Sequence, residues 1–190
     1  MPTNLEREIK LRYRNRHEAE VAIKTIQKSP HRERRLQDDR LLDLPEGSLR
    51  QKRRALRVRV ETFFGGRTTA LVTFKGTPQH DIMKVREEIE TTLGDGDTML
   101  HIFEKLGWRV WFRYQKYREE FITRNDVVIA LDETPIGMFI ELEGTKDAVV
   151  QLTKSLEKTS ADYINASYRK LYETDCLKAG RPVSDMVFKQ

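Results

Sequence analysis

Residues 55–64 of the chain, ALRVRVETFF, alternate between apolar and charged side chains and are followed by two glycines. In an extended strand, successive side chains point to opposite faces of the sheet. One face of this stretch is therefore apolar, and the other carries Arg57, Arg59 and Glu61. The segment predicts a strand whose apolar face is packed and whose charged face meets either solvent or a polar interior. The glycines predict a hairpin to the next strand.

The same two-residue period recurs along the chain. It predicts further strands over residues 5–13, 34–42, 68–75, 84–93, 110–123, 127–132 and 138–143. Residues 84–93 also suit an exposed helix, because glutamate and arginine favour helices, but we interpret them as a strand. Apolar residues at helical spacing predict helices over 17–29, 97–106, 146–156 and 161–172. The pattern predicts an α+β protein in which eight mostly antiparallel strands form a closed barrel with flanking helices.

The chain of 190 residues is expected to form a single domain over residues 1–175, followed by a C-terminal tail over 176–190. We expect the chain after Glu173 to be extended or poorly ordered. Cys176 is the only cysteine, which excludes an internal disulfide. The first residues lack the apolar run of a signal peptide, and no stretch approaches the roughly 18 to 20 apolar residues that cross a bilayer. We therefore expect a cytoplasmic protein with no membrane partner.

The balance of charge favours an anionic partner. The chain has 35 basic and 30 acidic residues, for a net charge of +5. Both signs are mixed along the sequence, and no aromatic residues are interleaved with basic runs such as residues 52–54 in the way that single-stranded nucleic-acid sites require. We expect no nucleic-acid partner and a small anionic ligand instead.

Six of the predicted strands carry polar or charged side chains two residues apart on one face. The acidic members are Glu6, Glu8, Glu88, Glu90, Glu141 and Glu143. The basic members are Lys10, Arg57, Arg59, Lys75, Arg86, Lys116 and Arg118. Carboxylates are the hard oxygen ligands that Mg²⁺ and Mn²⁺ prefer, and arginine and lysine bind phosphates. If this face lines the barrel interior, it predicts a site for a metal and a triphosphate.

The order of these motifs resembles the CYTH family of triphosphate tunnel enzymes, which includes class IV adenylate cyclases, thiamine triphosphatases and inorganic triphosphatases. Residues 6–10 fit the ExExK signature that opens the family. The later matches are Gln37, Asp39 and Asp43 for QxDxYFD, 56–59 for LRxR, 73–76 for TxKG, 86–90 for RxExE, 116–118 for KxR, 131–132 for LD, 136–143 for LGxFxExE, and Ser167-Tyr168 in the late helix. The resemblance covers about residues 5–172. Leu41 and Leu42 replace the aromatic pair of the family's second strand. This departure affects the assignment to a branch of the family, not the assignment to the family itself.

The resemblance implies roles for these residues. One or two Mg²⁺ or Mn²⁺ ions would be held by Glu6, Glu8, Glu141 and Glu143, with Asp132 assisting. Glu6, Glu8 and Lys10 would take part in catalysis. The triphosphate would be bound by Lys10, Arg57, Arg59, Lys75, Arg86, Lys116 and Arg118. Glu88 and Glu90 would orient Arg57 or Arg86 by paired hydrogen bonds.

The activity implied is that of a divalent-metal-dependent enzyme acting on a triphosphate such as ATP, thiamine triphosphate or tripolyphosphate. The motif order looks most like class IV adenylate cyclases, which convert ATP to cyclic AMP and pyrophosphate. An inorganic or thiamine triphosphatase is the alternative, and a non-catalytic module that binds polyphosphate or a nucleotide is a third hypothesis. A homodimer is compatible with the sequence.

Overall fold

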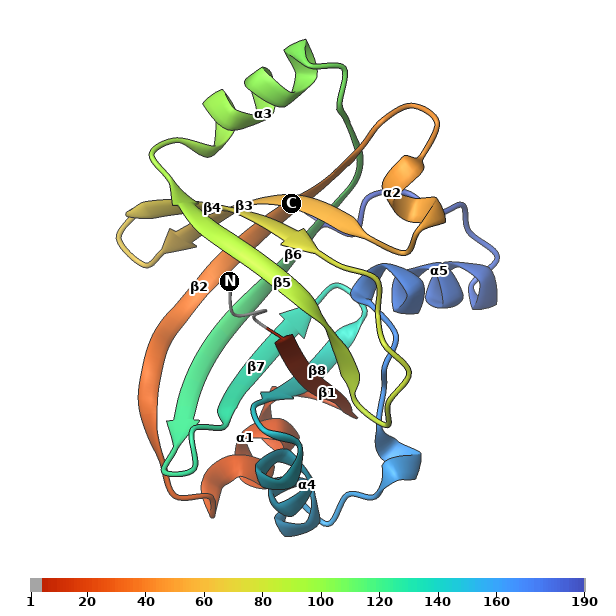
Figure 1. The fold of residues 1–190 in the computed structure, drawn as a ribbon. Coiled ribbons are helices and arrows are strands. Elements are labelled where there is room, and N and C mark those ends of the chain that lie inside the picture. Colours follow the sequence, from red (N-terminus) through yellow and green to blue (C-terminus); the bar gives the residue numbers. More distant parts are fainter. Residues whose placement is uncertain (1–4, 190) are drawn as a thin grey trace.

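The computed structural model describes residues 5–189, in which eight antiparallel strands close into a barrel (Figure 1). The order around the barrel is β1, β5, β4, β3, β2, β6, β7 and β8. This arrangement confirms the predicted closed barrel, and residues 84–93 form a strand rather than a helix. The strands are β1 (Leu5–Tyr13), β2 (Lys28–Asp43), β3 (Ala55–Phe63), β4 (Thr68–Lys75), β5 (Lys84–Leu93), β6 (Arg109–Thr123), β7 (Val128–Thr134) and β8 (Gly137–Glu143).

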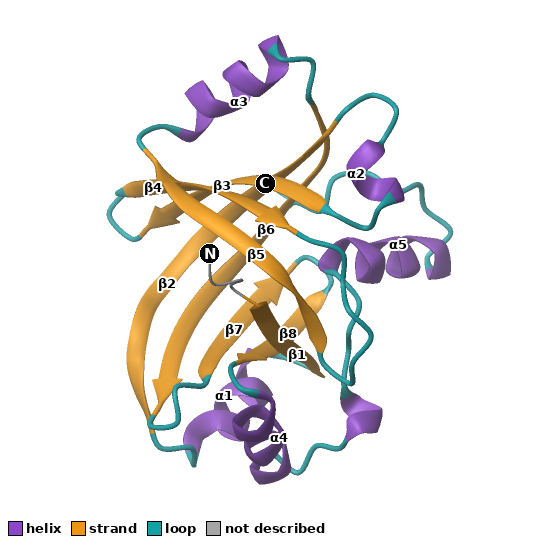
Figure 2. Ribbon diagram, in the orientation of Figure 1, coloured by secondary structure: helices purple, strands orange, loops and turns teal. Residues whose placement is uncertain are grey.

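Helices cover the outside and the ends of the barrel (Figure 2). In this view, α1 and α4 lie below β1, β7 and β8, while α3 stands at the opposite end beyond β3 and β4. The helix α5 runs along one side, next to the short α2. The bounds of the helices are α1 (Arg16–Lys24), α2 (Ser48–Gln51), α3 (Gly96–Lys105), α4 (Lys146–Ser155) and α5 (Tyr168–Lys178).

The strands carry charged side chains on the face that points into the barrel and, on β1, β7 and β8, apolar side chains on the outer face. The inward set on β1 is Glu6, Glu8 and Lys10, and cross-strand pairing places each of them beside an inward residue of a neighbouring strand. Lys10 lies opposite Glu141 of β8, for example. Because the side-chain period of a strand is two residues, this register fixes the whole charged set inside the barrel.

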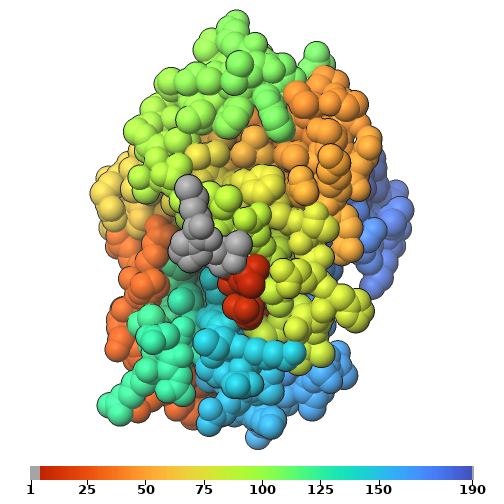
Figure 3. All heavy atoms as spheres, in the orientation of Figure 1, coloured from red at the N-terminus to blue at the C-terminus, as the bar shows by residue number. Residues whose placement is uncertain are grey.

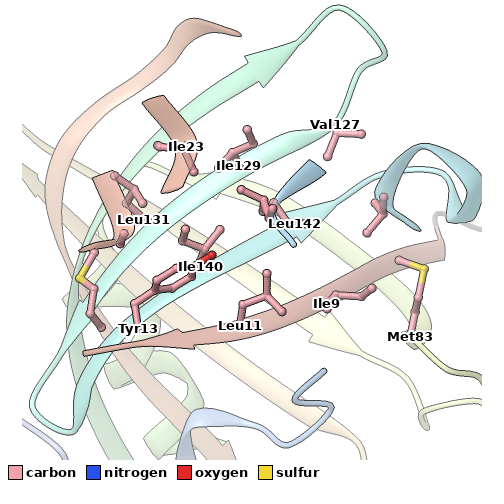
Figure 4. Packing of buried hydrophobic residues seen from close by; sticks show 14 of the residues in the cluster. Ile9, Leu11, Tyr13, Ile23, Met83, Val127, Ile129, Leu131, Ile140 and Leu142 are labelled. Atoms are coloured by element: carbon pink, nitrogen blue, oxygen red, sulfur yellow. The ribbon is translucent and has the colours of Figure 1, made fainter. Parts of the chain in front are cut away.

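The outer face of β1, β7 and β8 packs under α1 and α4. Ile9 and Leu11 of β1 and Ile140 of β8 have no solvent exposure and join side chains of β7 and of both helices in one cluster (Figure 4). Burial of such side chains contributes about 1.5–3 kcal/mol each. The apolar cluster therefore holds the strands in the register that places charges inside.

A second cluster joins α5 and the C-terminal segment to the barrel. Phe139 of β8 and Tyr114 of β6 have the inward-facing parity of their strands, and both rings pack near Tyr168 of α5, with centroids 5.4 and 6.4 Å away. Cys176 and Met186 are buried in the same cluster. This contact places α5 against polar side chains of the interior.

The helix predicted over 17–29 is wrong in its second half. α1 begins after Asn15, whose side chain accepts a hydrogen bond from the backbone N–H of Glu18 at 2.9 Å. It ends at Lys24, and β2 already begins at Lys28 because this segment pairs with β6. Pro30, which cannot donate a ladder hydrogen bond, lies at a register shift of that pairing. The strand predicted over 34–42 is correspondingly longer.

The late helix and the tail also differ from the prediction. Residues Ser160–Asp162 form a single 3-10 turn, and α5 starts only at Tyr168 and continues to Lys178. Beyond it, the backbone N–H of Met186 donates to Arg113 at 3.0 Å, and Gln115 donates back to Met186 at 2.8 Å. The chain after Glu173 is therefore helical at first and then docked on β6. The helix α2 was not expected.

The space-filling view shows how β1 sits in the wall of the barrel. The start of β1, in red, lies between the yellow-green segment around β5 and the cyan segment of β8 and α4 (Figure 3).

None of the helices in residues 5–189 is long and apolar enough to cross a membrane.

Shortening Met186 to alanine tests whether the tail is part of the folded unit. Met186 is 1% exposed, so Met186→Ala should lower the free energy of unfolding by about 2–5 kcal/mol, as loss of a buried methionine side chain does. Val183, in the same segment, is 46% exposed, and Val183→Ala should change it by less than about 0.5 kcal/mol. Urea unfolding measures both, and equal small effects would mean that the tail is not docked.

Candidate functional site

The barrel encloses a cavity of about 1380 Å³ that opens to solvent. Its wall contains charged side chains from seven strands, namely β1, β2, β3, β4, β5, β6 and β8. The structure thus brings together most of the predicted site residues, on the inward faces of their strands. Those that line the cavity are Glu6, Glu8, Lys10, Arg57, Arg59, Lys75, Arg86, Glu88, Glu90, Lys116, Arg118, Glu141 and Glu143.

Asp132 of β7 lies behind this wall and is fully buried. Its carboxylate accepts hydrogen bonds from Lys116 at 2.8 Å, from Arg118 at 2.7 Å and from the Tyr168 hydroxyl at 2.6 Å. Removing one partner of such a buried ion pair typically costs about 3–5 kcal/mol, because the remaining charge is left without compensation. These contacts are those of a residue that positions Lys116 and Arg118. Its role as a metal ligand stays a prediction.

Lys10 and Lys116 stand on the face of the Tyr168 ring. Their Nζ atoms are 4.5 and 4.8 Å from its centroid, within the range of cation–π attraction. Lys10 also pairs with Glu141 at 2.7 Å. Although burial opposes the charged form, Glu141 and Glu8 raise the pKa of Lys10 above its ordinary value. Two lysines are therefore held against the same ring at the cavity wall.

The environment of Lys116 has the opposite effect. Burial, together with the nearby Arg118 guanidinium, lowers the pKa of Lys116 to about 8. The neighbouring carboxylates of Asp132 and Glu141 offset only part of this effect. Lys116 is thus a basic residue whose charge depends on pH close to neutrality.

Asp39 of β2 contacts two arginines of β3, much as Asp132 contacts Lys116 and Arg118 of β6. It is fully buried and accepts two hydrogen bonds from Arg59, at 2.8 and 3.1 Å, and Arg57 lies 3.3 Å from the same carboxylate. Two parallel hydrogen bonds fix the plane of a guanidinium as well as its position. Arg59 is thereby fixed in orientation, Arg57 is held beside it by its ion pair with Asp39, and both line the cavity.

The carboxylates of Glu6 and Glu8 point into the cavity beside Glu143. Glu6 pairs with Lys75 at 2.7 Å and with Arg86 at 3.3 Å, and Glu8 pairs with Lys84. Burial opposes ionisation, but these bases lower the pKa of Glu6 and of Glu8.

Glu143 forms no ion pair with any described residue. Its neighbour across the β1–β8 pairing is another glutamate, Glu8. Glu143 is exposed at the end of the strand, but the surrounding barrel wall limits its solvation, and this, followed by the negative charges of Glu6 and Glu8, raises the pKa of Glu143 to about 7. This is the position of the cavity wall at which negative charge is in excess.

The two glutamates of β5 were predicted to orient Arg57 or Arg86. Glu90 contacts Arg57 at 3.3 Å and accepts a hydrogen bond from Thr73 at 2.7 Å. Glu88 contacts Lys75 at 2.9 Å and lies 3.8 Å from Arg57. Arg86 is oriented by Glu6 instead.

Three residues that contact the site were not predicted as site residues from the sequence. Lys84 lines the cavity and pairs with Glu8, and its parity on β5, shared with Arg86, could have indicated this. Asp39 and Tyr168 were recognised only as motif matches. Nothing in the sequence alone shows that Tyr168 lies under two lysines from β1 and β6, because that contact joins segments far apart in the chain.

The donor chemistry of the wall fits a divalent cation. Glu6, Glu8 and Glu143 offer the oxygen ligands that Mg²⁺ and Mn²⁺ prefer. Within residues 5–189, no three acidic, histidine or cysteine side chains are already gathered at metal-binding distance. A cation would have to compete with Lys75 and Lys84 for the carboxylates. The excess negative charge around Glu143 is the feature that favours it.

Because the pKa of Glu143 is raised, the folding stability of the protein should depend on pH. The measurement is made with a chelator, so that no metal ion binds near Glu143. Between its ordinary value of 4.5 and about 7, the folded state holds a proton that the unfolded state has lost, so stability falls as pH rises through this window. Glu143→Gln removes the effect. Its melting temperature should exceed that of the wild type at pH 8 by more than at pH 5.

Glu46→Gln, at an exposed turn, is the matched control and should show no such trend. Thermal unfolding followed by circular dichroism gives both differences. A Glu143→Gln effect that is the same at the two pH values would show that Glu143 titrates normally.

Comparisons with known proteins identify the family of the chain. The sequence matches the model of the CYTH domain over residues 4–172. It is 31% identical over 151 residues to a candidate adenylate cyclase of Methanocaldococcus jannaschii, covering 73% of this chain and 82% of that protein.

Solved structures share the fold. A candidate adenylate cyclase from Vibrio parahaemolyticus aligns with a TM-score of 0.76 at 23% identity, covering 90% of this chain and 99% of that one. A candidate adenylyl cyclase from Hippeastrum with a dominant triphosphatase activity aligns with a TM-score of 0.64 at 18% identity, covering 94% and 97%. With the charged barrel and the match over residues 4–172, these findings show that the chain belongs to the CYTH domain family.

Proposed function

We propose that the protein is a divalent-metal-dependent enzyme that binds a triphosphate inside the barrel, and that its reaction is the conversion of ATP to cyclic AMP and pyrophosphate. The similarity to the Methanocaldococcus jannaschii protein supports the cyclase assignment. The order of motifs along the strands supports it as well.

The balance of charge inside the barrel is the observation that carries the proposal. Ten basic side chains of the strands face or underlie the cavity, namely Lys10, Arg32, Arg35, Arg57, Arg59, Lys75, Lys84, Arg86, Lys116 and Arg118. Ten acidic ones accompany them, namely Glu6, Glu8, Asp39, Glu61, Glu88, Glu90, Glu120, Asp132, Glu141 and Glu143. A triphosphate would add several negative charges to a set that is already neutral. Divalent cations would offset that charge, because unpaired charge is costly in a poorly solvated site.

The residues divide into two chemical roles. Glu6, Glu8 and Glu143 would hold Mg²⁺ or Mn²⁺, with Glu141 beside them. Such an ion, when bound, supplies charge stabilisation at phosphate oxygens. Lys10, Lys116 and Arg118 would donate hydrogen bonds to the phosphate chain and stabilise the charge that develops as the phosphorus–oxygen bond breaks.

In the cyclase reaction, the ribose 3′-hydroxyl attacks the α-phosphorus and pyrophosphate leaves. Arg57 and Arg59, fixed by Asp39, would hold the departing phosphates, because a guanidinium already oriented loses little freedom on binding. Glu8 would accept the proton of the attacking hydroxyl, since its ion pair with Lys84 keeps it ionised at neutral pH.

Hydrolysis of a triphosphate is the second candidate function. Most of the strand side chains that line the cavity are charged groups suited to phosphates and a metal rather than to adenine. Water activated by the Glu6 or Glu8 carboxylate would then attack the terminal phosphorus. The dominant triphosphatase activity of the Hippeastrum protein, which shares the fold, makes this reaction worth testing directly.

A panel of triphosphates distinguishes the two reactions. ATP, thiamine triphosphate and tripolyphosphate are each incubated with the protein and Mg²⁺ or Mn²⁺, and the products are separated by chromatography. We expect cyclic AMP and pyrophosphate from ATP. Orthophosphate from tripolyphosphate or thiamine triphosphate, without cyclic AMP, would establish the hydrolase instead, and no turnover of any of the three would contradict an enzymatic role.

Glu8→Gln tests the part played by the acidic group. Turnover should fall by about 100-fold or more, because both a ligand and a proton acceptor are lost, while tripolyphosphate should still stabilise the protein against heat. The matched control is Glu87→Gln, which changes a glutamate of the opposite parity on β5. Unchanged turnover in Glu8→Gln would remove Glu8 from the mechanism.

A further inference from the structure

A group of basic side chains at the rim of the cavity is not part of the paired set inside the barrel. It consists of Arg50, Arg53 and Arg54 near α2 and of Arg169 and Lys170 on α5, all of which line the cavity. We call this group the basic collar. None of its members belongs to the motifs that match the CYTH family.

Two members of the basic collar are held in place by one indole ring. Arg50 and Arg169 both lie over the ring of Trp111 of β6, with guanidinium carbons 4.5 and 3.9 Å from its centroid. Arg50 also pairs with Asp43 at 3.0 Å, and Arg169 pairs with Glu173 at 2.7 Å. These cations are therefore ordered before any ligand arrives, which reduces the entropy lost on binding.

Two other members have no acidic partner. Arg53 and Arg54 are exposed, and within residues 5–189 no carboxylate lies within ion-pair distance of either. Every basic side chain inside the barrel, by contrast, has such a partner. Arg53 also has a φ of 56°, a left-handed conformation that a non-glycine residue adopts only when the surrounding turn requires it. The loop between α2 and β3 thus presents uncompensated positive charge to the cavity.

The basic collar continues a path of positive charge out of the barrel. Arg59, Arg57 and Ala55 share the inward face of β3, and Arg54 and Arg53 directly precede that strand. The cavity of about 1380 Å³ also exceeds the roughly 300–1,000 Å³ of common small-molecule sites. The cavity therefore has room and charge for more than three phosphates.

We propose that the basic collar is an additional anion-binding subsite that takes phosphate groups beyond the first three, so that linear polyphosphates of four or more phosphates bind more tightly than tripolyphosphate. The proposal rests on the triphosphate site of the proposed function. It adds a preference for chain length that the residues inside the barrel do not provide. An extra phosphate gains contacts with Arg53 and Arg54, whereas an uncharged organic group gains none.

Calorimetric titration of the whole protein with tripolyphosphate and with tetraphosphate, in the presence of Mg²⁺, tests the proposal. The wild type should bind tetraphosphate about tenfold more tightly than tripolyphosphate, as one added charge-assisted contact provides. The double variant Arg53→Gln/Arg54→Gln should lose this preference and keep its affinity for tripolyphosphate within about twofold. Lys24→Gln/Arg124→Gln removes the same charge at exposed sites outside the cavity wall and should keep the preference.

Three results would overturn the inference. Equal affinities of the wild type for the two anions would show that the basic collar does not contact the ligand. A preference that survives in the Arg53 and Arg54 variant would place the extra phosphate elsewhere. An equal loss of preference in the control variant would mean that net charge alone is responsible. Failure of tripolyphosphate itself to bind the wild type would instead contradict the triphosphate site on which the proposal rests.

Discussion

The pairing of buried charges is the constraint on which the rest of the structure depends. Asp132 is out of contact with water and holds Lys116, Arg118 and Tyr168 through hydrogen bonds, while buried Asp39 accepts two hydrogen bonds from Arg59 and forms an ion pair with Arg57. A polar interior of this kind is stable only when nearly every charge has a partner. The same pairs fix the basic side chains in space, so the condition for folding also prepares the site for an anion.

The fold and the site are coupled because they occupy opposite faces of the same strands. Ile9 and Leu11 pack under the helices while Glu8 and Lys10 face the cavity. A slip of one residue in β1 would exchange the two sets, and the loss of apolar burial would oppose it. α5 adds a further link, because Tyr168 belongs both to an aromatic cluster and to the hydrogen-bond network of Asp132.

Much of this could be predicted from the sequence, because a period of two residues reports directly which side chains share a face. The closed barrel and the inward position of most predicted site residues follow from it. The ends of α1 and α5 could not be predicted, since pairing of β2 with β6 and docking of the tail on β6 decide them. The contacts of Asp132 and the placement of Tyr168 also depend on neighbours distant in the chain.

We propose that this neutral, paired interior accepts a triphosphate. A crystal structure of the protein with tripolyphosphate and Mg²⁺ tests it most directly. We predict phosphate oxygens within hydrogen-bond distance of Lys10, Lys116 and Arg57, and a cation beside Glu6 and Glu8. Tripolyphosphate bound only on the outer surface, with the ion pairs Lys75–Glu6 and Lys10–Glu141 undisturbed, would contradict the account.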